Sequence, residues 1–158
     1  MTSEWESRVA NFWASADDSE IEKSLAAMKT LVDELDPLDP NGLYEWASVH
    51  DFLGLESQAI DIYKDALANG LEGVKREKAI IQLASSLRNV GKSSEAIELL
   101  QRTDFSSATK VAAQAFLALA HFSANNEGKA VQLLIDELYP ADGLYARSIK
   151  FYAKEIAE

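Results

Sequence analysis

Histidine and carboxylate side chains are the groups in this sequence that could carry acid–base or metal chemistry. The chain has two histidines, His50 and His121, and no cysteine. Its acidic pairs, such as Asp17-Asp18 and Asp136-Glu137, lie at expected helix ends and have no histidine at ligand spacing. A metal site or an acid–base pair needs several such groups to converge. We therefore expect no catalytic residue, no metal ligand and no cofactor, and we predict that the chain is not an enzyme.

A polar stripe offers a different chemistry, that of recognition. Five side chains that donate or accept hydrogen bonds recur at three- and four-residue steps: Lys78, Gln82, Ser85, Arg88 and Asn89. On a helix this spacing puts them on one face. The planar fork of Arg88 could hold a carboxylate or peptide carbonyls of a partner. The alternative is a solvated face with an internal salt bridge, for example from Arg88 to Asp51.

Charge excludes some partners. The chain carries 26 acidic and 15 basic residues, a formal net charge of −11, which argues against binding a phosphate backbone. No long apolar run predicts a membrane span, and the opening residues carry acids and no apolar signal core, so we expect a cytoplasmic protein. Residues 1–72 have a net charge of −12 and residues 73–110 a net charge of +3. A peptide with one basic and one acidic end would match this polarity.

The elements that position these residues are predicted to be helices. Apolar residues recur at helical steps, as at Ile80, Leu83 and Leu87, without any sustained alternation of period two. Pro37 and Pro40 break the chain, and Ser3 with Glu6 is a capping pair at the start of the first helix. The predicted helices span residues 4–15, 19–35, 41–53, 56–68, 73–90, 93–102, 107–124, 127–138 and 143–157.

An internal repeat selects the helical architecture. After a shift of 37 and a further shift of 34 residues, small and large residues recur in the same order. The positions in the first repeat are Trp46-Ala47, His50, Gly54, Ala59, Tyr63 and Ala66. Those in the second repeat are Leu83-Ala84, Leu87, Gly91, Ala96, Leu100 and Thr103. Those in the third repeat are Leu117-Ala118, His121, Asn125, Ala130, Leu134 and Glu137. We interpret the alanines as the points where paired helices touch. The third repeat matches the pattern least well, because Asn125 replaces the turn glycine and Glu137 replaces the last small residue.

This pattern resembles the tetratricopeptide repeat. Over about residues 40–157 it is similar to the bacterial tetratricopeptide type called group five, on runs such as His50 to Leu55, Ile81 to Gly91 and Ser148 to Ala153. The resemblance implies a bacterial interaction module without catalytic residues. It implies an all-α, right-handed superhelical stack of antiparallel helix pairs, a tetratricopeptide-like α-solenoid with a C-terminal capping helix.

We expect one helical-repeat domain over residues 1–158. Residues 41–140 form three repeats, residues 143–157 form the capping helix, and residues 1–38 form a helix pair that can be interpreted as a degenerate repeat. In the cap, we expect Leu144, Ile149, Phe151, Tyr152 and Ile156 to cover the third pair.

The first helix of each pair is expected to line a concave groove. There we place a partner-binding site that takes in the polar stripe: Tyr44, Ser48, Asp51, Phe52, Lys78, Gln82, Ser85, Arg88 and Asn89. The predicted function is a protein–protein interaction scaffold that binds a peptide or a helix of a partner protein, with no nucleic acid or membrane partner. The alternative is self-association into a homodimer or other homo-oligomer, through the groove or an exposed apolar end.

Overall fold

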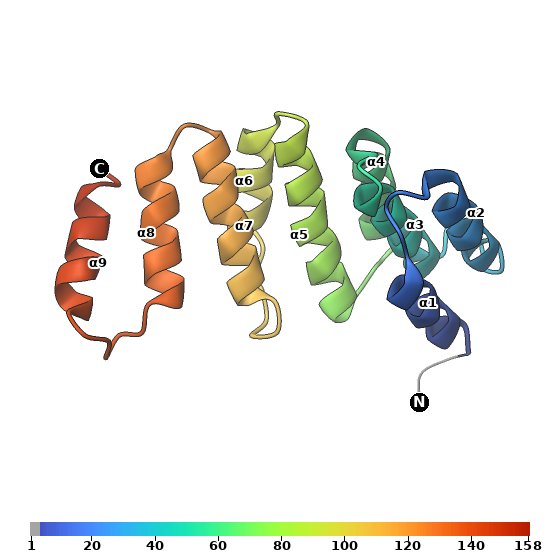
Figure 1. The fold of residues 1–158 in the computed structure, drawn as a ribbon, viewed down its shortest axis with the longest axis horizontal. Helices are drawn as coiled ribbons and strands as arrows, with labels where there is room; N and C mark the ends of the chain where they lie inside the picture. The colour runs from blue at the N-terminus through green and yellow to red at the C-terminus, as the bar shows by residue number, and fades with distance from the viewer. Residues whose placement is uncertain (1–3) are drawn as a thin grey trace. The chain divides into compact units, whose positions relative to one another are not determined.

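The computed structural model describes residues 4–158, so Ser3, part of the expected start of the first helix, lies outside the described residues. All nine predicted segments are helical, and residues 4–158 contain no strand (Figure 1). The all-α class is therefore confirmed. The helices are α1 (Glu4–Ser15), α2 (Ile21–Val32), α3 (Pro40–Phe52), α4 (Glu56–Ala68), α5 (Gly73–Asn89), α6 (Ser93–Gln101), α7 (Lys110–Ser123), α8 (Glu127–Leu138) and α9 (Ala146–Glu155).

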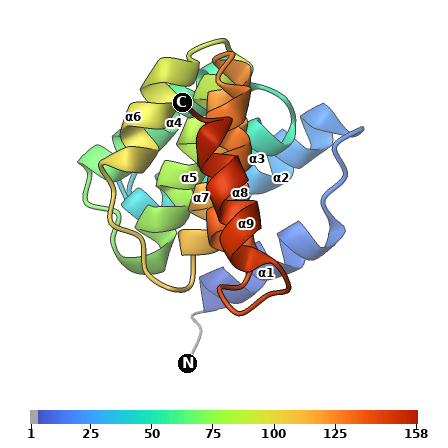
Figure 2. The same ribbon diagram turned by 90° about the vertical axis from the view of Figure 1, so that its left-hand side faces the viewer.

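The chain divides into two compact units. The first ends at Ala79, within α5, and the second begins at Ile80. In the first unit α1 packs on α2, α2 on α3 and α3 on α4. In the second unit α6 packs on α7, α7 on α8 and α8 on α9; Figure 1 shows α8 and α9 side by side, and in Figure 2 α9 lies in front of α8. Within each unit, helices that are consecutive in the chain are neighbours in space, as short connections require.

The core of the first unit joins its first three helices. Met28, Val49 and Leu53 form a buried apolar cluster. The partly buried side chains packed against it are Phe12, Trp13, Leu25, Leu31, Val32, Trp46 and Leu55. At the edge of the cluster Trp5 Nε1 donates a hydrogen bond to the Leu31 carbonyl over 2.8 Å. α1 is therefore held on α2 by apolar contact and by a directed hydrogen bond.

The repeated alanines of the helix pairs are buried. Ala47, Ala84 and Ala118, on the first helix of each pair, are at most 1% exposed. The matching alanines of the second helices are also buried: Ala59, Ala96 and Ala130. A methyl group at these points lets two backbones come near one another without leaving a void. The burial expected for the repeated alanines is thus confirmed.

The turns between paired helices repeat in backbone conformation. Gly54, Gly91 and Asn125 all have a positive φ, of 72°, 81° and 58° respectively. One residue later an N–H bonds back to a carbonyl five positions earlier, which closes the end of the first helix. These hydrogen bonds are Leu55 N to His50 O at 2.8 Å, Lys92 N to Leu87 O at 2.8 Å and Asn126 N to His121 O at 2.9 Å. Asn125 can take the glycine position because asparagine tolerates the left-handed region.

The segment from Pro37 to Pro40, where a break is predicted, leads directly into α3. The Asp39 carboxylate accepts hydrogen bonds from Asn41 N at 2.8 Å and Gly42 N at 3.2 Å, and Pro40 occupies the first helical position. A proline there loses nothing, because the first N–H groups of a helix have no partner within it. α3 therefore has a fixed beginning.

α9 approaches α8 through its smallest residues, and this corrects the expected role of its large ones. Ala146 and Ala153 are buried, whereas the side chains expected to cover the third pair are mostly exposed. The exposed members are Leu144, Phe151, Tyr152 and Ile156, and Ile149 is half-buried. At the closest point a Cβ on Gly128 would lie 1.8 Å from the Ile156 carbonyl oxygen. Glycine is therefore required at the start of α8.

Gly128→Ala is expected to destabilise the chain, because the added methyl group must push the end of α9 away. Overpacking of this kind costs about 1–3 kcal/mol. The measurement is the free energy of unfolding in urea. The matched control is Gly42→Ala in the first turn of α3, where the new Cβ would meet side chains and no backbone: Leu35 at 3.3 Å and Val32 at 4.0 Å. Because alanine favours a helix over glycine by about 1 kcal/mol, the control should be neutral or stabilising. Equal stability of the two variants would show that α9 is not held at Gly128.

Candidate functional site

The predicted site residues of α3 divide into buried and accessible groups. The Ser48 side chain is buried: its hydroxyl donates to the Tyr44 carbonyl at 2.8 Å and accepts from the Tyr63 hydroxyl at 3.3 Å. The rings of Tyr44 and Tyr63 lie 6.4 Å apart. Burial raises the pKa of Tyr44 to about 12 and raises the pKa of Tyr63 further, so both stay neutral donors. Ser48 thus supports the α3 face from inside, and Tyr44 is only half-buried.

The end of α3 presents an aromatic edge. Phe52 is 40% exposed, and its ring meets the Trp13 ring edge to face at 5.8 Å. Asp51, beside it, is half-buried. This end of the first unit therefore offers a fixed apolar side chain next to a carboxylate.

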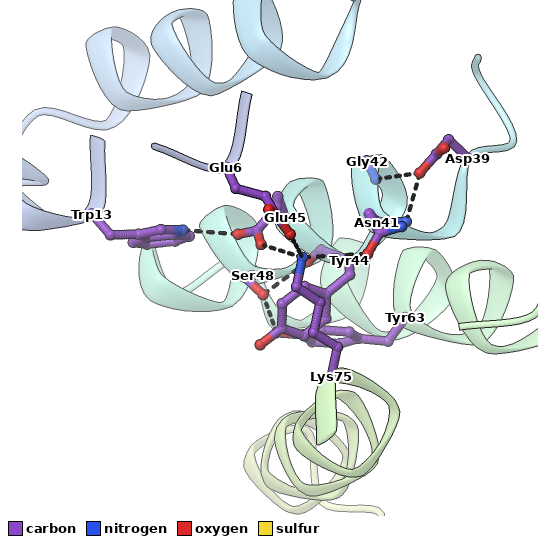
Figure 3. A network of polar contacts seen from close by, with 10 residues as sticks. All are labelled: Glu6, Trp13, Asp39, Asn41, Gly42, Tyr44, Glu45, Ser48, Tyr63 and Lys75. Carbon is purple, nitrogen blue, oxygen red and sulfur yellow. Dashed lines mark hydrogen bonds and ion pairs between the residues drawn. The ribbon is translucent and has the colours of Figure 1, made fainter. Parts of the chain in front are cut away.

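A buried carboxylate lies at the centre of the first unit (Figure 3). Glu45 is only 5% exposed, and its Oε2 accepts a hydrogen bond from Trp13 Nε1 at 2.8 Å. Its Oε1 lies 3.9 Å from Lys75 Nζ. Burial raises the pKa of Glu45, while the Trp13 hydrogen bond and then the charges of Lys75 and Lys78 oppose that rise. The network ties α1, α3 and the start of α5 together.

Lys75 is the hub of this network. Its Nζ lies 4.0 Å from Glu6 Oε1, donates to Asn41 Oδ1 at 3.3 Å and sits 5.9 Å from the centre of the Trp5 ring (Figure 3 shows Glu6 and Asn41). Sequence reasoning missed Lys75. The available signal was Asn41 and Glu45 at helical spacing on one face of α3, beside a lysine in the first turn of α5, where a cation opposes the helix dipole.

The polar stripe on α5 is only partly accessible. Lys78 belongs to the first unit and is exposed, whereas Gln82 and Ser85 in the second unit are half-buried and Asn89 is exposed. The Gln82 Oε1 atom is buried and has no hydrogen-bond partner among the described residues. The structure thus leaves an unused acceptor within the predicted stripe.

Arg88 holds neutral partners. Its Nη1 donates to Ser123 Oγ on α7 at 3.3 Å and its Nη2 to Asn89 Oδ1 at 2.8 Å. Its Nε is buried and lacks a partner within the described part of the chain. A guanidinium oriented by two neutral groups keeps its positive charge for a carboxylate from elsewhere. Ser123, at the end of α7, joins this cluster from the third repeat.

Both histidines pack inside their units. His50 is buried, its Nδ1 is 2.7 Å from the Trp46 carbonyl, and its ring meets the Trp46 ring at 4.4 Å. His121 is buried too: Asn126 Nδ2 lies 3.3 Å from its Nδ1, and burial, with the charge of Lys129, lowers its pKa. Among residues 4–158 no three histidine or carboxylate side chains come together as metal ligands. Both histidines lie in the last turn of the first helix of a repeat and are buried there.

A second surface, which we name the α9 patch, is apolar and basic. Leu144 and Tyr145 are 74% and 72% exposed. The rest of the patch is formed by Phe151, Tyr152 and Ile156, with Arg147 and Lys154 between them in sequence, all exposed. Exposed large apolar side chains grouped in this way are a common feature of interaction surfaces.

The buried carboxylate gives a pH prediction. Because the pKa of Glu45 in the folded chain is raised above its ordinary 4.5, its contribution to stability is fully present below that value and is lost as the pH rises through the folded pKa. Glu45→Gln keeps an oxygen acceptor for Trp13. Because glutamine does not ionise, the variant does not lose stability at this position as the pH rises. We expect the free energy of unfolding of the variant, relative to that of the wild type, to increase as the pH rises from 4.5. The measurement is urea unfolding followed by tryptophan fluorescence. Glu22→Gln, at an exposed position of α2, is the control and should parallel the wild type. A constant difference between Glu45→Gln and wild type would contradict the prediction.

None of the helices described in residues 4–158 has the length and hydrophobicity to cross a membrane. A family model described as "Tetratrico peptide repeat" matches residues 40–156. No curated protein and no solved structure matches the chain. The matched range begins at α3 and ends with α9, so it takes in the three helix pairs with their repeated turns. The chain belongs to the tetratricopeptide repeat family, as the resemblance of its sequence indicates.

Proposed function

We propose that this chain is a non-catalytic scaffold that holds a peptide or a helix of a partner protein. Tetratricopeptide repeats generally mediate protein–protein interactions, which supports the class of function. The proposal takes the chain as one helical-repeat domain, in which three repeats stack as a right-handed superhelix and the last helix caps it. In such a stack the first helices of the repeats line a concave side.

The observation that carries the proposal is the set of hydrogen-bond partners of Arg88. Its two hydrogen bonds go to neutral groups and its Nε is buried with no partner among the described residues. A buried donor without a partner is costly, by about 1–3 kcal/mol. A carboxylate of a bound peptide would supply an acceptor and a counter-charge together.

The other residues of the proposed site differ in what they offer a partner. Tyr44 and Phe52 offer aromatic surface, Asp51 and Lys78 offer charges, and Ser48 orients the Tyr44 segment from inside. Ser85 and Asn89 flank Arg88 at helical spacing, and Asn89 fixes its guanidinium. Arg88 suits an acidic group of a partner, and Phe52 suits an apolar side chain of a partner.

Arg88→Ala is expected to weaken partner binding by about tenfold or more, because a charge-assisted hydrogen bond contributes about 1.5–3 kcal/mol. Stability should change little, since Arg88 is only half-buried. The wild type and the variant are immobilised side by side, proteins retained from a lysate are identified, and the retained protein is titrated in purified form.

Arg102→Ala is the matched control, because Arg102 follows α6 and pairs with Glu98 at 3.6 Å on an exposed surface. It should bind as the wild type does. Intact binding by Arg88→Ala together with a lower melting temperature would reverse the assignment and make Arg88 a structural residue.

The α9 patch favours a second candidate function, self-association through an exposed apolar end. Its large side chains are exposed rather than packed on α8. Light scattering coupled to size exclusion distinguishes the two candidates, since a scaffold for other proteins gives the chain mass of 17.4 kDa at every concentration.

A further inference from the structure

The first unit has an apolar pocket where α2 passes into α3. Its volume is about 260 Å³. The apolar lining comes from Val32, Leu35, Pro37, Leu43 and Trp46, over Gly42. Lys29, Asp33 and Asp36 also line it, and Lys29 forms an ion pair with Asp33. The pocket can take one large apolar side chain and has a net acidic rim.

A second pocket shares the Leu35 wall. It has a volume of about 390 Å³ and is otherwise lined by Trp5, Glu6, Asp39 and Asn41. Two carboxylates and an indole face make a site for a cation. Lys75 already lies beside this pocket, 5.9 Å from the centre of the Trp5 ring and 4.0 Å from Glu6 Oε1, and the two carboxylates with this lysine keep a net negative charge. The two pockets together suit an apolar side chain with a basic neighbour.

The α9 patch presents that combination. Phe151 is 57% exposed, with Arg147 four residues before it and Lys154 three residues after it. On a helix such positions are neighbours about 5–6 Å apart. An apolar side chain therefore stands between two cations on one flank of α9. Tyr152 and Ile156 extend the apolar surface on the other side.

We propose that chains associate head to tail, with the α9 patch of one copy docked in the two pockets of the first unit of the next. Phe151 enters the apolar pocket, and Arg147 or Lys154 enters the acidic one. The inference rests on the second candidate function and names both of its surfaces. Charge supports a second copy as the occupant: residues 1–72 have a net charge of −12, whereas α9 carries three bases and one acid. Opposite charges steer the two surfaces together.

A head-to-tail contact uses two different surfaces, so each added copy leaves both kinds of surface free at the ends. Full-length wild type should therefore grow in mass with concentration past two chains. The association should weaken in high salt, because the exposed part of the charge attraction is screened.

Two full-length variants test the pairing. The first changes the α9 patch, with Phe151→Ser and Lys154→Glu; the second changes the pockets, with Asp33→Lys and Pro37→Lys. All four residues are exposed, and circular dichroism melting confirms that each variant folds. Each variant alone should be monomeric in light scattering. An equimolar mixture should form one-to-one pairs of about twice the 17.4 kDa chain mass, because each partner retains one intact surface.

The control variant carries Ser57→Lys and Asp61→Lys on the exposed face of α4. It changes the net charge by the same amount as the pocket variant and should assemble like the wild type. Assembly by either single-surface variant alone, or no pairing in the mixture, would overturn the inference while leaving self-association in place. A wild type that is monomeric at all concentrations would remove both the second candidate and the inference. Binding of a monomeric wild type to anionic vesicles would also overturn it, by assigning the patch to a membrane.

Discussion

Close approach between helix backbones is the constraint on which both units depend. Six alanines repeat where paired helices meet, and all are buried. Gly128 extends the same rule to the last pair, where even a methyl group has no room. Large side chains are consequently displaced to the flanks of the contacts. Tyr63 fills such a flank completely, whereas those of α9 remain in solvent.

The network at Glu45 shows what a buried charge does in such a helical unit. A carboxylate that is 5% exposed is costly unless it is paired and hydrogen-bonded. Trp13 and Lys75 supply these partners from two other helices. The arrangement contributes orientation more than net stability, because it satisfies the carboxylate in only one placement of α1 on α3. The Arg88 cluster is the opposite case, since its charge is oriented by neutral groups.

The sequence predicted the helices, their turns and the buried alanines, because these follow from local periodicity and residue size. The break predicted at Pro37 and Pro40 contains the observed N-cap of α3, Asp39. The side chains of the candidate site were harder to predict. Ser48 lies four residues after Tyr44 and three after Glu45. Ser48 and Glu45 are nevertheless buried, because Tyr63 and α1 cover them. Periodicity defines a face of a helix, but it does not tell which neighbour covers that face. The same limit applies to α9, where apolar spacing predicted a cap and the contact is made by Ala146 and Ala153.

The repeated turns have a consequence for how such a chain can diverge. Positions 54, 91 and 125 have a left-handed backbone, which glycine adopts without steric cost and asparagine or aspartate at small cost. Packing positions accept any combination of side chains that conserves volume. Substitution can therefore reduce the similarity of the repeats along their helices more readily than at these turns, where the backbone angle restricts the choice of residue.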